Sequence, residues 1–305
     1  MHFGYNEYDN RQRRASGMRG AHGGLVSMLL RHPRILLILV FLGFGVFKYF
    51  GSTEKKENPF TGESVRVALK PEQEVALGLQ STPQMIQQFG GELADERQQR
   101  RIDQIGQRLL KAKDEVLRRR GIDDFDYPFR FHILRDNQTI NAFALPGGPV
   151  FITQALLRQL PSDDAVAGVL GHEIGHVLAW HSNQRMAQSS LFQSIAGAVS
   201  MATDDPRIGR AAGQFVGQFL QTKYGREDES QSDCIGVQLL MVACYQPESL
   251  MDVMEVLQGS MKGPRWPEML STHPFPETRK KQIVEYIQFF RADPFAEWDA
   301  SDGWN

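Results

Sequence analysis

The residues best suited to do chemistry lie in the segment VLGHEIGHVLAWH, at positions 169–181. His172 and His176 are four residues apart, so on a helix both rings lie on one face and can bind the same metal ion. Glu173 lies beside them and can hold a water molecule bound to that ion. His-Glu-x-x-His is typical of zinc-dependent hydrolysis, but five-residue patterns also recur by chance. A buried helix that only happens to carry histidines is therefore the alternative.

The residues around this motif predict the helix that a metal site would need. Pro161 and Ser162 form a helix start, with Ser162 as the N-cap, and apolar residues follow at helical spacing. Gly168, Gly171 and Gly175 each lower helix propensity by about 1 kcal/mol relative to Ala. A helix built only for stability would not carry these glycines, so we expect it to pack closely against a neighbouring backbone.

A third histidine in the same segment, His181, has to be tested as a ligand. The longer metzincin motif requires Gly seven residues and His ten residues after the first His. Ala179 and Ser182 occupy those positions here. We therefore exclude His181 as a ligand and expect a structural or surface role for it.

The third ligand must come from another segment, and catalytic zinc with two histidines commonly takes a glutamate. The best candidate is YGREDESQSD (224–233), which comes directly before an apolar helix. Glu229 and Asp233 are four residues apart and share a helix face. We expect Glu229 to bind the metal and Asp233 to support a ligand imidazole. Without the histidine pair, these acids would be interpreted as a solvated helix start.

These motifs together resemble a known family. HEIGH, then REDESQSD, then STHPFPETR are similar to the HtpX/BepA/LoiP-like zinc metalloproteases, which are related to the CAAX prenyl endopeptidases. That family shows Arg-x-x-Glu-x-x-Ala-Asp around its third ligand. Arg226, Glu229 and Asp233 match this pattern, while Ser232 stands where Ala is usual. The resemblance covers approximately residues 58–290 and implies one Zn²⁺ per chain.

The resemblance also implies roles for positions outside the two helices. His273 resembles a histidine placed near the metal, where it would stabilise the oxyanion or cap the zinc at rest. Arg279 would tie that loop to the acidic ligand helix. Asn141, Ala142 and Phe143 look like the edge that pairs with an extended substrate by β-augmentation. Without the resemblance, His273 would be only a lone histidine in a loop.

Patterns along the chain predict an α+β domain that is mostly helical. Residues 71–90 predict one helix interrupted near Ser81–Pro83, and residues 95–120 predict an amphipathic helix with a solvated arginine face. Residues 129–136 alternate as a strand does, and residues 141–160 predict strand, turn, strand and helix start. The resemblance adds that this is a gluzincin-type metalloprotease domain with a small sheet.

The N-terminal region predicts a membrane anchor. The run ILLILVFLGFGVF (35–47) carries no charge, and sixteen helical residues from 35 to 50 span about 24 Å of a hydrocarbon core of about 30 Å. A cleaved signal peptide is the alternative, although no cleavage-site pattern follows the run. Six arginines precede the run, so the positive-inside rule places the N-terminus in the cytoplasm and the remainder outside it.

These assignments divide the chain into five parts. They are a disordered cytoplasmic tail (1–30), a single transmembrane anchor (31–50), a polar linker (51–64), the zinc metalloprotease domain (65–290) and a C-terminal tail (291–305). Residues 190–220 separate the two metal motifs, and we expect them to form two helices that cover the cleft as a lid.

Composition narrows the remaining possibilities. A net charge of −2 gives no reason to expect nucleic-acid binding. Cys234 and Cys244 are ten residues apart on a predicted helix, about 15 Å, which exceeds the reach of a disulfide at about 7 Å. We therefore expect both cysteines to be unpaired. The oligomeric state is not predicted.

The function that these observations predict is a membrane-anchored zinc endopeptidase acting on misfolded or envelope proteins. Glu173 would take a proton from zinc-bound water as it attacks the scissile carbonyl. The alternative is a chaperone or assembly factor for envelope proteins, with latched or low protease activity. The presence of Glu173 beside the metal argues against a purely structural ion.

Overall fold

The computed structural model describes residues 51, 53–123, 126–189, 223–260, 268–273 and 278–298. The chain divides into two compact units, Met1–Phe50 and Gly51–Asn305, and every described residue belongs to the second. The predicted tail, the predicted anchor at 31–50 and the predicted lid at 190–220 lie outside the described residues. Within the described ranges, no helix has the length and apolar character needed to cross a membrane.

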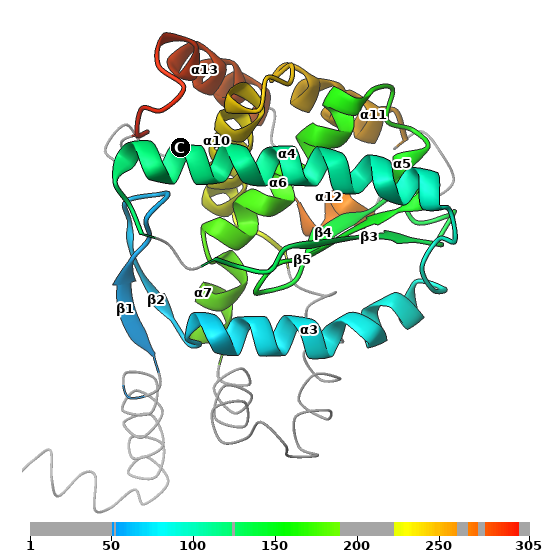
Figure 1. Ribbon diagram of the computed structural model, residues 1–305, viewed down its shortest axis with the longest axis horizontal. Coiled ribbons are helices and arrows are strands. Elements are labelled where there is room, and N and C mark those ends of the chain that lie inside the picture. The colour runs from blue at the N-terminus through cyan, green and yellow to red at the C-terminus, as the bar shows by residue number, and fades with distance from the viewer. Residues whose placement is uncertain are drawn as a thin grey trace, which may run out of the picture. The chain divides into compact units, whose positions relative to one another are not determined.

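The described elements are mostly helices with two small sheets, which confirms the expected α+β class (Figure 1). In chain order they are β1 (Glu54–Glu57), β2 (Ser64–Val67), α3 (Pro71–Gln88), α4 (Glu96–Arg120), β3 (Arg130–Leu134), β4 (Ala142–Ala144), β5 (Pro149–Thr153), α5 (Gln154–Leu157), α6 (Asp163–Leu178), α7 (His181–Gln188), α10 (Arg226–Val242), α11 (Ser249–Ser260), α12 (Glu268–Thr272) and α13 (Thr278–Ala292). Strands β1 and β2 form an antiparallel hairpin. The other sheet has the order β3-β5-β4, with β3 parallel and β4 antiparallel to β5.

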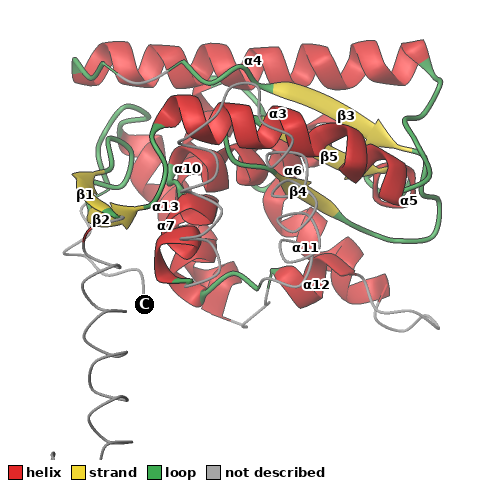
Figure 2. Cartoon of the chain, turned by 90° about the horizontal axis from the view of Figure 1, so that it is seen from below, coloured by secondary structure: helices red, strands yellow, loops and turns green. Residues whose placement is uncertain are grey.

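The three-stranded sheet separates two apolar cores. Alternate residues of β5 point to opposite faces, as in any strand. Val150 and Ile152 pack into the larger core with α4 and α6, whereas Phe151 packs with Leu77 of α3 on the other face. Helices α4 and α3 accordingly lie above and below the sheet in Figure 1, and Figure 2 shows α4 lying across one side of the described elements.

Helix α3 runs from Pro71 to Gln88 without the interruption that we predicted near Ser81–Pro83. A proline inside a helix costs about 3 kcal/mol because it removes one backbone hydrogen bond. Leu77 and Met85, on either side of Pro83, are both fully buried in the same core. Burial of both halves of the helix against one core outweighs the cost of the proline.

The segment 51–64, which we expected to be a polar linker, is part of the folded domain. It contains β1 and the loop to β2, and the Asn58 side chain at the start of that loop is fully buried. Asn58 Oδ1 accepts hydrogen bonds from the backbone N–H groups of Phe60 and Thr61, and Asn58 Nδ2 donates to the carbonyl of Leu178 at 2.8 Å. The polar composition of this segment did not reveal that it packs against the domain. The side chain of a single asparagine, Asn58, makes the hydrogen bonds that the loop backbone needs.

Helix α6 packs directly against α10, as its glycines predicted. A Cβ atom on Gly175 would lie 2.8 Å from the carbonyl oxygen of Ser232, and one on Gly171 would lie 3.5 Å from that of Gly236. The predicted N-cap is also confirmed, because Ser162 Oγ accepts a hydrogen bond from the Ala165 N–H at 3.1 Å. The glycines therefore set the distance between the two helices that carry the candidate ligands.

We expect Gly175→Ala to lower the free energy of unfolding by about 1–3 kcal/mol, because the added methyl must displace the Ser232 carbonyl. Gly171→Ala is the matched control, since its methyl would make only an ordinary contact. Its better helix propensity should leave stability unchanged or raise it by up to about 1 kcal/mol. Urea unfolding followed by circular dichroism measures both variants. Equal effects would contradict the close-packing role of Gly175.

Candidate metal centre

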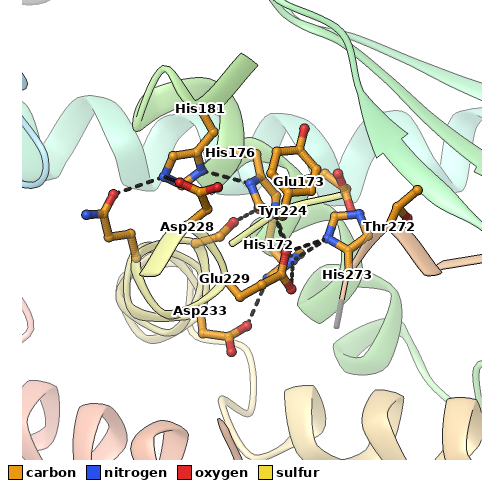
Figure 3. A network of polar contacts seen from close by, with 12 residues as sticks. His172, Glu173, His176, His181, Tyr224, Asp228, Glu229, Asp233, Thr272 and His273 are labelled. Carbon is orange, nitrogen blue, oxygen red and sulfur yellow. Dashed lines mark hydrogen bonds and ion pairs between the residues drawn. The ribbon is translucent and has the colours of Figure 1, made fainter. Parts of the chain in front are cut away.

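Helices α6 and α10 and the residue that follows α12 bring four donor atoms together (Figure 3). His172 and His176 extend from α6, Glu229 lies in the first turn of α10, and His273 follows α12. One donor atom from each of these residues lies within 4.8 Å of the other three, and all four residues are buried. The structure therefore brings the three ligands predicted from the sequence together with the histidine suggested by the resemblance.

The spacing of these atoms fits a tetrahedral metal ion. Nε2 of His172 and Nε2 of His176 are 3.1 Å apart, and carboxylate oxygens of Glu229 lie 3.7 and 3.5 Å from them. A tetrahedron with bonds of about 2.0–2.1 Å has edges of about 3.3 Å. Two imidazoles and one carboxylate are also a donor set that catalytic zinc sites use. These residues therefore fit the ion that the sequence predicted.

His273 supplies the fourth donor of the cluster. Its Nδ1 lies 2.9 Å from Glu229 Oε1 and 3.4 Å from His172 Nε2. Its other ring nitrogen, Nε2, is buried without a hydrogen-bond partner among the described residues. The resemblance allowed two roles for His273, stabilising the oxyanion or capping the ion. The position of Nδ1 is the one that a cap on the ion requires.

Glu173 lies beside the cluster and is not one of its four members. Both of its carboxylate oxygens are buried, and neither has a hydrogen-bond partner in the described part of the chain. Oε1 lies 3.8 Å from His273 Nε2. Burial raises the pKa of Glu173 above its usual range, although the charges of His273 and His172 oppose this shift. A carboxylate with no partner of its own is well placed to accept a proton.

A second layer of buried charges holds the candidate ligands. Asp233 Oδ1 lies 2.8 Å from His172 Nδ1, which leaves His172 Nε2 directed at the cluster. Arg279 of α13 donates to Asp233 at 2.8 Å and to Glu229 at 2.6 Å. Burial raises the pKa of Asp233, but Arg279 and His172 outweigh it and hold that pKa below its usual range. Asp233 and Arg279 thus make the contacts expected of them.

Two residues for which we expected no such role contact His176. His181 Nδ1 lies 2.8 Å from His176 Nδ1, and the Tyr224 ring stacks on the His176 ring with centroids 3.8 Å apart (Figure 3). His181 is outside the donor cluster, as expected, but it is fully buried and does not lie on the surface. Burial lowers the pKa of both His176 and His181. The only sequence signal for His181 was its position five residues after a candidate ligand, and no pattern in the sequence indicated Tyr224.

The candidate substrate edge lies at β4, beside the helix that leads to His273. The backbone N–H of Met269, in α12, donates to the carbonyl of Ile140 at 3.3 Å. Asn141 follows, and its Oδ1 is buried with no hydrogen-bond partner among the residues that the structure describes. An amide oxygen left in this state can accept a hydrogen bond from a ligand.

The backbone of β4 alternates between its two sides. Toward β5, the carbonyl of Asn141 accepts a hydrogen bond from the N–H of Thr153, and the N–H of Leu145 donates to the carbonyl of Pro149. The alternation of an antiparallel pair then directs the backbone of Ala142, and of its neighbour two residues on, to the outer edge of the sheet. Only alternate residues of β4 can therefore pair with an added strand.

Phe143 does not fit the substrate-binding role that we expected. Its backbone belongs to the half of the alternation that faces β5, and its ring is buried. The ring packs against Phe89 and Phe151, with centroids 5.4 and 4.9 Å away. Phe143 is therefore a core residue in this structure.

The sequence matches the profile of Peptidase family M48 over residues 96–287. The matched range includes all four members of the donor cluster and Glu173. The chain therefore belongs to peptidase family M48, a family of metal-dependent proteases. This membership confirms the class of metalloprotease that the motifs resembled.

The chain is similar to several curated proteins. It is 30% identical over 189 residues to the beta-barrel assembly-enhancing protease of Escherichia coli (strain K12), covering 58% of this chain and 36% of that protein. It is 31% identical over 166 residues to mitochondrial metalloendopeptidase OMA1 of Schizosaccharomyces pombe, covering 53% and 48%. Against the OMA1 metalloendopeptidase of Bos taurus it is 26% identical over 273 residues, covering 85% and 51%. The chain thus spans between 36% and 51% of the length of these relatives.

Proposed function

We propose that the chain is a zinc-dependent endopeptidase in which His172, His176 and Glu229 hold one Zn²⁺. The observation that carries the proposal is Glu173, whose buried carboxylate has no hydrogen-bond partner among the described residues and lies beside two imidazoles and a carboxylate at tetrahedral spacing. Family membership supports it. The proposal includes a membrane anchor at 31–50 and a catalytic domain outside the cytoplasm, on the basis of the apolar run and its flanking arginines.

The residues around the cluster divide the work of peptide hydrolysis. When bound, the ion would polarise the scissile carbonyl and lower the pKa of the attacking water toward about 7. Glu173 accepts a proton from that water and delivers it to the leaving amine. Its raised pKa favours this exchange, because a base works best when its pKa lies near the working pH. Asp233 keeps His172 in the tautomer that binds metal.

We expect Glu173→Gln to retain zinc and to lose proteolysis by about 10²–10⁴-fold, because the amide cannot accept the proton. Zinc content by elemental analysis and casein cleavage, with and without a chelator, measure both properties. The wild type should lose cleavage with chelator and recover it with Zn²⁺. A Gln variant that cleaves casein as fast as the wild type would rule out the mechanism. Recovery of the chain in carbonate-washed membranes tests the anchor in the same preparation.

An extended substrate would add to the outer edge of the sheet at β4. Ala142 directs its backbone to this edge, and the Oδ1 of Asn141 would accept a hydrogen bond from the substrate backbone. The contact between α12 and Ile140 supports this placement, because it brings the edge beside His273. The substrate would then be held through its main chain, which suits unfolded or extended protein segments of many sequences.

Asn141→Ala should raise KM about tenfold while kcat changes little, because one hydrogen bond to the bound substrate is lost. The stability of the free protein should not fall, since Asn141 Oδ1 has no partner among the described residues. Thr153→Val is the matched control. Among the described residues, the Thr153 hydroxyl bonds the backbone of Asn141 and Leu156, so its removal should lower stability and raise KM less than Asn141→Ala does. An unchanged KM for Asn141→Ala would contradict this placement of the substrate.

The position of His273 favours a second candidate, a chaperone or assembly factor for envelope proteins whose protease activity is latched. With His273 Nδ1 in the donor cluster, four protein atoms surround the site, and a substrate carbonyl has no open position. The two candidates differ in how much activity the resting protein shows. In both, His273 would have to move before a peptide is cleaved.

His273→Ala should cleave casein faster than the wild type, because the substitution opens the fourth position. It should also bind zinc more weakly, since one donor is lost. Initial rates at saturating zinc separate the two effects. A slower rate for His273→Ala would instead assign this ring to stabilising the oxyanion.

A further inference from the structure

His181 begins a chain of hydrogen bonds that leads away from the candidate metal site. His181 Nδ1 lies 2.8 Å from His176 Nδ1, and His181 Nε2 lies 2.9 Å from Gln231 Oε1. Gln231 Nε2 then donates to Glu63 Oε2 at 2.9 Å. His181 and Gln231 are buried, whereas Glu63 lies at the boundary with solvent, in the loop of the β1–β2 hairpin. The chain therefore links a ligand of α6 to the N-terminal hairpin.

Glu63, the last group of this series, determines which atom donates in each of its hydrogen bonds. An ionised carboxylate only accepts, so Glu63 requires the NH₂ group of Gln231, and the amide oxygen of Gln231 is left facing His181. That oxygen requires the N–H of His181 at Nε2, which leaves Nδ1 of His181 as an acceptor. His176 must then carry its proton on Nδ1. Its Nε2 is left with a lone pair directed at the donor cluster, which is the form that binds metal.

The backbone is bent to bring His181 into this position. On a continuous helix, a residue five positions after His176 would lie about 140° around the axis from it. Trp180, between α6 and α7, has φ 59° and ψ 28°, in the left-handed region that costs a non-glycine residue about 1–2 kcal/mol. This turn ends α6 and directs His181 back onto the His176 ring. A strained residue at this point is consistent with a role for the contact it creates.

The other charged groups near this series of hydrogen bonds already have partners of their own. Asp228 Oδ1 is 3.9 Å from His181 Nε2, too far for a hydrogen bond. The Asp228 carboxylate instead pairs with Arg185 and accepts from the backbone N–H of Gly225. Gln231 is therefore the hydrogen-bond partner of His181 on that side of the ring.

We propose that Glu63, Gln231 and His181 form a positioning relay that fixes the ring and tautomer of His176, so that the Glu63 contact from the β1–β2 hairpin loop sets the metal affinity of the site. The loop is docked separately, because Asn58 donates to the carbonyl of Leu178. Asn183 also accepts from the backbone N–H groups of Ala68 and Leu69, just after β2. The relay rests on the proposed function in one respect, namely that His176 holds metal.

The test measures the zinc dissociation constant of the full chain in detergent, by competition with a chromophoric chelator. His181→Phe keeps the size of the ring and removes the acceptor, so zinc should bind about 10–100-fold more weakly. His181→Asn keeps an acceptor near the position of Nδ1 and should stay within about threefold of the wild type. Equal affinities for wild type and His181→Phe would overturn the relay. If His181→Phe does not fold, the Glu63 variants below carry the test.

Variants of Glu63, at the far end of the relay, test whether the hairpin loop affects His176. Glu63→Leu frees the Gln231 amide to turn over, so zinc affinity should fall about tenfold. Combining Glu63→Gln with Gln231→Glu moves the carboxylate one step inward and reverses only the outermost hydrogen bond. His181 Nε2–H still donates to position 231, so the double variant should restore wild-type affinity. In the metal-free protein, ¹⁵N shifts should place the His176 proton on Nδ1 in the wild type and increasingly on Nε2 in Glu63→Leu. An unchanged affinity and tautomer in Glu63→Leu would overturn the link to the hairpin.

Asn183→Ala is the matched control, because it weakens docking of the same hairpin without touching the relay. It should lower the melting temperature of the metal-free protein and leave zinc affinity unchanged. A loss of affinity as large as that of His181→Phe would make the effect one of general stability and overturn the relay. A wild type that binds no zinc would instead overturn the proposed function.

Discussion

The candidate site depends on the close approach of two helices. Helix α6 carries two of the donors and α10 carries the third, and their backbones come close enough that Gly175 has no room for a side chain opposite Ser232. Ser232 uses the same proximity to donate from its hydroxyl to the carbonyl of His172. The sheet, α4 and α11 pack around this pair of helices. If α6 and α10 lay further apart, each donor would keep its place on its own helix, but the three donors would be too far apart to bind one ion.

The cluster also has a charge requirement. Glu173, Glu229 and Asp233 are buried carboxylates, and among the described residues Arg279 is the one buried guanidinium in contact with Glu229 and Asp233. With all of them ionised, three negative charges face one positive charge, and the excess of two equals the charge of a divalent cation. Uncompensated buried charge is costly, so such an excess favours either proton uptake or an ion. Burial of these charges would thus favour a doubly charged partner at the candidate site.

The sequence predicted those parts of the site that depend on local spacing. His172 with His176, and Glu229 with Asp233, are each four residues apart, so each pair shares a helix face whatever the rest of the fold does. The glycines of α6 predicted the close packing without naming the partner helix. His181 could not be placed in this way, because its contact depends on the left-handed turn at Trp180. Metal ligation itself, and the roles of Asn141 and His273, stay predictions.

Because the hairpin loop is part of the fold, the catalytic domain begins earlier in the sequence than we predicted. Composition suggested a boundary near residue 65, but a fragment cut there would lack Asn58 and Glu63. The carbonyl of Leu178, in the last turn of α6, and the side-chain amide of Gln231 would each lose a partner. The segment that follows the predicted anchor therefore contributes to the interior of the enzyme. Displacement of β1 would strain the hydrogen bond from Asn58 to Leu178, at the end of the helix that carries His172 and His176.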